Sequence, residues 1–180
     1  MADDDAFSIM GRYLTEAATE LFDSYGMSVR RLPDQTRVAP GATPDQSIVA
    51  VIGYAGDKVR GALVLVATRS AVESWLDALG ENPQNTDLFD TVGEFSNMML
   101  GRLKARLSPQ GFPILLSTPT TASGDALRLS KPPGPSSWLA FGGSGWRLDV
   151  RIDATFEPGV VLQESDVPST GVESGEMLLF

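Results

Sequence analysis

The strongest structural signal in the sequence is a long helical repeat at residues 87–107. Apolar side chains recur there at three- and four-residue spacing, which is the period of an α-helix, and Pro109 and Gly111 follow as helix-ending residues. One stripe of the predicted helix contains five apolar residues: Leu88, Val92, Phe95, Met99 and Leu103. We expect this stripe to lie on the core of the domain.

The opposite side of the same helix carries polar residues and a glycine. Spaced four, three, four and three residues apart, they form one continuous stripe: Asp90, Glu94, Asn97, Gly101 and Lys104. A solvated face is the ordinary interpretation of such a stripe. Asn97 and Gly101 are nevertheless poor helix formers, which indicates selection for something other than helix stability. Gly101 either lets another molecule approach the Asn97 amide or packs against this chain itself, and the sequence favours neither.

The other segments predict an α+β domain. Besides the long helix, the sequence predicts helices at 6–25 and 70–79 and strands at 28–32, 47–54, 58–68, 113–118, 126–129, 138–141 and 146–155. The short links at 55–57 and 142–145 favour antiparallel pairing. We therefore expect a mostly antiparallel sheet with two long helices packed on it. The element order suggests a weak repeat, in which each half is a long helix followed by about three strands.

Local signals define the ends of the two other helices. Gly26 follows the first helix, whose apolar stripe runs from Phe7 to Tyr25. Ser70 and Glu73 predict a capping box for the short helix, and Gly80 predicts its end.

The net charge of −9 is concentrated at the two ends of the chain. Residues 3–5 are all Asp, and residues 157–180 contain five acids and no Lys or Arg. Such like charges favour solvation over packing. We therefore predict one domain at 1–156, with an acidic leader at 1–5, followed by an acidic C-terminal extension at 157–180.

Composition excludes several classes of function. The chain has no Cys and no His, which excludes disulfides, thiol nucleophiles, Ser-His-Asp triads and the usual zinc sites. The acidic balance argues against binding to nucleic acid. No signal peptide and no apolar run of membrane-spanning length is found in the sequence, so we expect a cytoplasmic protein with no membrane contact. Any catalysis must use carboxylates, amides, hydroxyls, Lys or Arg.

Residues 87–124 resemble the CheX/CheC class of chemotaxis phosphatases. The residues that carry the resemblance are Asp90, Glu94, Asn97, Gly101 and Lys104 on the long helix, then Gly111-Phe112, Ser117-Thr118-Pro119 and Gly124. The pattern of Glu-x-x-Asn alone is weak, and the Gly-x-x-Lys and Ser-x-Pro segments behind it make it more specific.

The resemblance implies a phosphatase that acts on the phospho-aspartate of a CheY-like receiver domain. Asn97 would orient the attacking water, and Glu94 would pair with the receiver's active-site Lys. The receiver would hold Mg²⁺, and this chain would need no cofactor of its own. Asp90, Gly101, Arg102 and Lys104 would contact the receiver, the two cations mainly increasing the association rate. For Arg102, Lys104 and Arg106 the alternative is a solvated basic cluster.

The chain departs from the two-site members of this class on its first helix. Those members carry a second Glu-x-x-Asn there, whereas this chain has Glu16 with Thr19 and Glu20 with Asp23. The resemblance is therefore to the single-site, CheX-like branch, whose members pair as homodimers through sheet edges. An extension at 157–180 that covered an edge would oppose such a dimer.

Two other functions remain open from the sequence. A CheX-like module could bind a receiver or another signalling partner without accelerating hydrolysis, because a fold does not guarantee an activity. Asn97 separates the two hypotheses, since a binder has no need of an amide beside the acid. Sensing of a small ligand on the sheet is a third hypothesis, and no residue in the sequence supports it.

Overall fold

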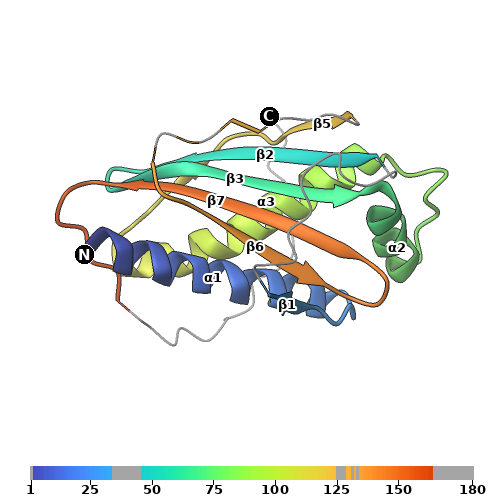
Figure 1. Ribbon diagram of the computed structural model, residues 1–180, viewed down its shortest axis with the longest axis horizontal. Coiled ribbons are helices and arrows are strands. Elements are labelled where there is room, and N and C mark those ends of the chain that lie inside the picture. Colours follow the sequence, from blue (N-terminus) through green and yellow to red (C-terminus); the bar gives the residue numbers. More distant parts are fainter. Residues whose placement is uncertain (1, 34–45, 125–128, 131, 133, 164–180) are drawn as a thin grey trace.

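The computed structural model describes residues 2–33, 46–124, 129–130, 132 and 134–163 (Figure 1). The elements are α1 (Ala2–Ser24), β1 (Arg30–Leu32), β2 (Ser47–Ala55), β3 (Val59–Thr68), α2 (Arg69–Leu79), α3 (Leu88–Leu107), the 3-10 helix η2 (Ser108–Gln110), β4 (Leu115–Leu116), β5 (Thr120–Gly124), β6 (Ser136–Gly142) and β7 (Arg147–Phe156). The predicted α+β fold with two long helices is confirmed.

Within the described residues the sheet has seven strands in the order β1-β6-β7-β3-β2-β4, and β5 also pairs with β2. Every pairing is antiparallel, as the short links predict. The hairpins β2–β3 and β6–β7 meet at the central β3–β7 pair. The first strand of each half pairs with the hairpin of the other half: β1 with β6, and β4 and β5 with β2. The predicted repeat is thus a pair of interlocked halves, each a long helix followed by strands.

The core lies between one face of the sheet and the helices. α1 and α3 lie side by side on that face, and α2 covers its end (Figure 1). Alternation along β7 shows how the strand separates the faces, because side chains two residues apart point the same way. Leu148, Val150, Ile152 and Ala154 enter the main core, whereas Asp149 and Asp153 on the other face pair with Arg147 and Arg151.

Helix α1 starts earlier than predicted and includes the acidic leader. The helix begins at Ala2; the side chain of Asp5 is exposed and that of Ala6 is buried. The predicted apolar stripe is buried except at its two ends, where Phe7 is half-buried and Tyr25 is exposed. Gly26 ends the helix in the left-handed conformation, with φ of 71°, as predicted.

The predicted capping box of α2 is wrong. Thr68, not Ser70, is the N-cap, and its hydroxyl accepts a hydrogen bond from the backbone N–H of Ala71 at 3.2 Å. The helix begins one residue before the predicted position, so Ser70 lies inside its first turn. The Glu73 carboxylate instead lies 3.8 Å from the guanidinium of Arg69, which is one helical turn earlier in the sequence. Gly80 ends the helix with φ of 75°.

The segment after α3 forms two short strands where the sequence predicts one. Both strands pair with β2. Between them, the Ser117 hydroxyl accepts a hydrogen bond from the Gly53 N–H at 2.9 Å, and this side-chain bond interrupts the backbone pairing with β2. Strand β5 is not among the predicted elements. Most of the strand predicted at 126–129 lies outside the described residues, and Leu129 belongs to no strand.

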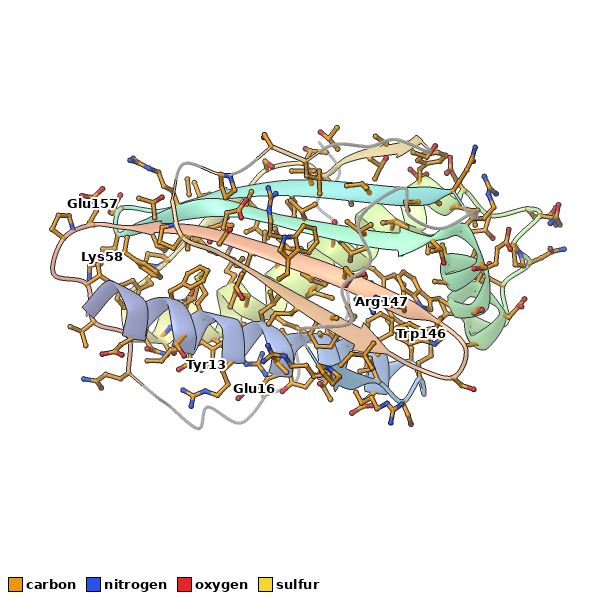
Figure 2. The ribbon with its side chains drawn as sticks, in the orientation of Figure 1. Tyr13, Glu16, Lys58, Trp146, Arg147 and Glu157 are labelled. Carbon is orange, nitrogen blue, oxygen red and sulfur yellow. The ribbon has the colours of Figure 1, made fainter. Side chains whose placement is uncertain are left out.

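The described part of the C-terminal extension packs on the domain. The Glu157 N–H donates to the Lys58 carbonyl at 2.9 Å, and Val160 and Leu162 are buried in the main core. Figure 2 shows Lys58 and Glu157 together at one end of the sheet, with Trp146 near the other end. Residues 157–163 therefore add to the core, and 164–180 lie outside the described residues. No helix in the described ranges is long and apolar enough to cross a membrane.

Candidate functional site

Helix α3, which carries the predicted site residues, is fixed at both ends. The Asp87 carboxylate caps the N-terminus by accepting from the backbone N–H of Phe89 at 2.8 Å and of Asp90 at 3.4 Å. After Leu107 the chain continues through η2 to Gly111, whose φ is 80°. Phe112 then folds back, and its N–H donates to the Leu107 carbonyl at 3.2 Å. Both ends of the helix are thus held by local hydrogen bonds.

The predicted inner stripe of α3 is buried as expected. Its five apolar residues are all between 0% and 6% exposed: Leu88, Val92, Phe95, Met99 and Leu103. Arg106 is also buried, at 7% exposure, which contradicts its assignment to a solvated basic cluster.

The predicted outer stripe faces away from the core. Asp90, Glu94 and Asn97 are exposed, and Gly101 and Lys104 are half-buried. Within the described ranges, neither the Glu94 carboxylate nor the Asn97 amide makes a hydrogen bond or an ion pair. Residues three apart on a helix are neighbours, with Cβ atoms about 5–6 Å apart. The acid and the amide therefore lie side by side with their polar atoms directed to solvent.

The space around Gly101 decides between the two interpretations left open by the sequence. A Cβ placed on Gly101 would have no heavy atom of another element within 4 Å among the residues that the structure describes. Close packing against this chain does not explain the glycine. The helix surface at Gly101 is instead open, and it lies one turn after Asn97.

One border of this face is the strand β5 and the turn before it. A Cβ on Gly93 would lie 3.5 Å from Cγ2 of Thr121 and 3.8 Å from Cβ of Pro119, so α3 packs closely on this segment. The bond between Ser117 and Gly53 holds the same segment to β2. The Ser-Thr-Pro motif therefore has a structural role beside the helix.

The other border is α1, which runs antiparallel to α3. The buried Arg106 guanidinium bonds to the Glu20 carboxylate and, at 3.3 Å, to that of Glu16. Arg102 reaches the Ser24 hydroxyl at 3.5 Å, so it lies at the boundary of the two helices rather than on the outer stripe. Glu16 and Glu20 are thereby committed to a contact between the helices and do not form a second acid-amide site.

Tyr25 is a border residue that the sequence analysis missed. Helical periodicity assigns it to the buried stripe of the first helix, but its side chain is 37% exposed. Its hydroxyl lies 3.3 Å from the Met98 sulfur. A position immediately before a helix-ending glycine is the only sequence signal for this exposure, because the last turn of a helix projects beyond its packing partner.

Other features of the structure lie apart from this face. A cavity of about 420 Å³ is lined by residues of β2, β3 and β7 and by Pro132, Gly134 and Pro135, and it shares no residue with the outer stripe of α3. In the described ranges, no group of three or more acidic side chains is placed to hold a metal ion.

A family model described as "Chemotaxis phosphatase CheX" matches residues 48–140, which include α3 and most of the sheet. No curated protein matches the chain.

Solved structures of several chemotaxis proteins have a similar fold. CheX from Vibrio vulnificus has a TM-score of 0.67 and 21% identity, with 81% of this chain and 96% of that chain covered. A CheC-like protein from Shewanella oneidensis has a TM-score of 0.65 and 21% identity over 80% and 96% of the two chains. CheX in a complex with CheY, BeF₃ and Mg²⁺ from Borrelia burgdorferi has a TM-score of 0.62 and 15% identity over 79% and 96%.

Proposed function

The chain belongs to the chemotaxis phosphatase CheX family, and from this premise we propose that it dephosphorylates the phospho-aspartate of a CheY-like receiver domain. The observation that carries the proposal is the pair Glu94 and Asn97, exposed side by side on α3 and without a partner among the described residues. The Borrelia burgdorferi complex of CheX with CheY supports a receiver as the partner.

Asn97 acts on the attacking water. Phosphoryl transfer depends mostly on positioning and on neutralising charge, so a residue that holds a water in line with the phosphorus contributes directly to the rate. An amide does this well because it is uncharged and does not repel the phosphoryl oxygens. Phe95 and Met99, two residues before and two residues after Asn97, are both buried, and their packing fixes the helix that presents the amide.

Glu94 and the rest of the outer stripe position the receiver. The Glu94 carboxylate pairs with the active-site Lys of the receiver, and Mg²⁺ is bound by the receiver, so this chain supplies no metal ligand. Asp90 and Lys104 contact the receiver surface, and Gly101 allows its close approach. Arg102 contributes from the boundary with α1, and the two cations mainly raise the association rate.

A non-catalytic module that binds the receiver through the same face is the alternative. It predicts the same docking surface but no function for the Asn97 amide. We also propose homodimerisation through sheet edges, for which the described outer strands β1, β4 and β5, of three, two and five residues, offer short edges.

The experiment that tests the proposal follows the decay of phosphorylated CheY-type receivers from the same organism in the presence of Mg²⁺. The wild-type protein accelerates the decay, and Asn97→Ala lowers the acceleration by about 100-fold or more, because the water loses its positioning group. Glu94→Ala mainly raises KM. Asn85→Ala removes an exposed amide outside α3 and serves as the matched control, with unchanged activity.

The possible outcomes separate the two functions. Equal acceleration by the wild type and Asn97→Ala overturns the role of the amide. Binding of a receiver without any acceleration by the wild type supports the non-catalytic alternative. Unfolding of Asn97→Ala, measured by circular dichroism, contradicts the outward orientation of the side chain.

A further inference from the structure

We infer that Tyr25 and Met98, at the boundary of α1 and α3, form an apolar part of the receiver-docking surface next to Glu94 and Asn97. The inference rests on the proposed function and extends it to a second helix. The first element of the surface is the outer stripe of α3, and the second is the C-terminal end of α1.

The contacts of Tyr25 place its side chain beside the candidate catalytic pair. The ring of Tyr25 packs on the ring of Phe95, with centroids 5.7 Å apart and an angle of 31° between the planes. Its hydroxyl lies 3.3 Å from the Met98 sulfur. Met98 lies four residues after Glu94 on α3, so the two are neighbours on the helix surface and the tyrosine adjoins the outer stripe. A protein that covers the pair also meets this ring.

The backbone and the ring of Tyr25 are both held by local contacts, which favours the use of this residue in binding. Three backbone hydrogen bonds fix the end of α1: Tyr25 to Phe22, Gly26 to Asp23 and Met27 to Phe22, all between 2.9 and 3.0 Å. Beneath the tyrosine, Phe95 belongs to a buried aromatic cluster and stacks on Trp75 at 5.1 Å. A preformed aromatic side chain loses little conformational freedom when it binds.

The equivalent boundary in the other half of the fold is covered by chain. Gln110 precedes Gly111 as Tyr25 precedes Gly26, and Tyr13 lies as far before Gly26 as Met98 lies before Gly111. The Gln110 amide donates to the Tyr13 hydroxyl at 2.6 Å, as Tyr25 contacts Met98. The Tyr13 hydroxyl in turn donates to the Gln163 carbonyl, and the neighbouring Leu162 is buried.

At one of the two equivalent boundaries, Gln163 bonds to both Tyr13 and Gln110. On one side the segment 157–163 covers the boundary, whereas on the other side Tyr25 stays 37% exposed beside the candidate site. Tyrosine and methionine are enriched in protein interfaces because each offers a large apolar area, and tyrosine adds a hydroxyl. The open boundary therefore fits a protein partner, and its position assigns that partner as the receiver.

Steady-state kinetics and direct binding of the receiver test the inference together. Tyr25→Ala raises KM for the phosphorylated receiver by about 10-fold and leaves kcat within about twofold, as truncation of an interface anchor does. Tyr25→Phe, which keeps the ring, stays within about threefold of wild type in KM. Met98→Lys keeps the tyrosine but places a charge on the boundary, and it also raises KM. Leu115→Ala is the matched control, since Leu115 is 77% exposed in β4, and its kinetics stay unchanged.

Each outcome bears on a different claim. Wild-type KM in both Tyr25→Ala and Met98→Lys, with folding confirmed by circular dichroism, overturns the inference and leaves the proposed phosphatase intact. If no receiver is dephosphorylated by the wild type, the proposed phosphatase fails instead. Binding measured by tryptophan fluorescence then decides: weaker binding by Tyr25→Ala but not by Asn97→Ala supports the docking surface, and equal or absent binding overturns it.

Discussion

The two halves of the molecule are built alike around their long helices but differ in what they expose. A glycine with positive φ follows each helix, Gly26 just after α1 and Gly111 after α3 and η2, and a buried apolar residue comes next in both halves. Counted back from these glycines, buried positions coincide in pairs: Met10 with Phe95, Leu14 with Met99, Ala18 with Leu103, Leu21 with Arg106 and Phe22 with Leu107. The repeat therefore determines which helix face enters the core.

The outer faces have diverged. Arg12 lies as far before Gly26 as Asn97 lies before Gly111, and Ile9 occupies the position equivalent to Glu94. Glu16 and Glu20, the acids at the candidate positions for a second pair, both bind Arg106, and neither has an amide residue three positions later. The comparison shows that inward positions preserve the fold, while outward positions are free to specialise on one helix.

The strands beside the two helices differ as well. In the second half, Gly93 brings α3 close to Thr121 in β5. In the first half, a groove of about 370 Å³ lies between α1 and strands β1 and β6, and it is lined in part by Gly11, Arg12 and Arg31. The candidate site thus sits on the helix whose flanking strand is closely packed, where the geometry of the outer stripe is better defined.

Replacement of Arg106 by its counterpart in the other half is the largest test of this comparison. Arg106→Leu lowers the free energy of unfolding by about 2 kcal/mol, because two charge-assisted hydrogen bonds are lost and leucine recovers part of the packing. Urea denaturation measures the loss. The matched control is Arg69→Leu, whose ion pair is long and partly exposed and whose loss changes stability by less than about 0.5 kcal/mol. Equal stability of Arg106→Leu and wild type would show that Leu21 and Arg106 are interchangeable in the two halves.

Substitution of the glycines on the two helices has a smaller effect and separates stability from binding. Gly11→Ala and Gly101→Ala each raise the free energy of unfolding by about 0.5–1 kcal/mol, since neither Cβ meets an atom of another described element and alanine favours the helix. Thermal denaturation measures both. Only Gly101→Ala raises KM for the receiver, by a few-fold, because it narrows the approach to Asn97. A similar rise with Gly11→Ala contradicts the assignment of docking to α3.

Transfer of the acid-amide pair to α1 has the smallest expected effect. In an Asn97→Ala background, Ile9→Glu with Arg12→Asn restores no measurable phosphatase activity, because segment 157–163 covers the boundary equivalent to Tyr25 and Met98. Receiver decay in the Asn97→Ala protein alone is the baseline. Recovered activity would contradict the proposed difference between the two helices, because the Glu-Asn pair alone would then be sufficient for phosphatase activity on either of them.

Much of the fold was predictable because its signals are local. The spacing of apolar residues in 87–107 gives α3 and its buried stripe, and glycines give the helix ends at Gly26 and Gly80. Strand β5 was not predictable, since its residues Thr120–Gly124 lack a buried alternating pattern and lie at the outside of the sheet, paired with β2. The capping residue of α2 was missed because Ser70 has Glu73 three residues later, as in a capping box, whereas Thr68 has Ala71 there.

The sequence by itself determined which residues stand on the outer stripe of α3, because side-chain direction on a helix depends only on position along the chain. It therefore placed Glu94 and Asn97 together without knowledge of the sheet. Only the tertiary structure decided what borders them. Arg106 is buried rather than solvated because α1 brings two acids to it, and Tyr25 is exposed beside Met98 because α1 ends there. Such contacts join residues more than 70 positions apart, which no local pattern encodes.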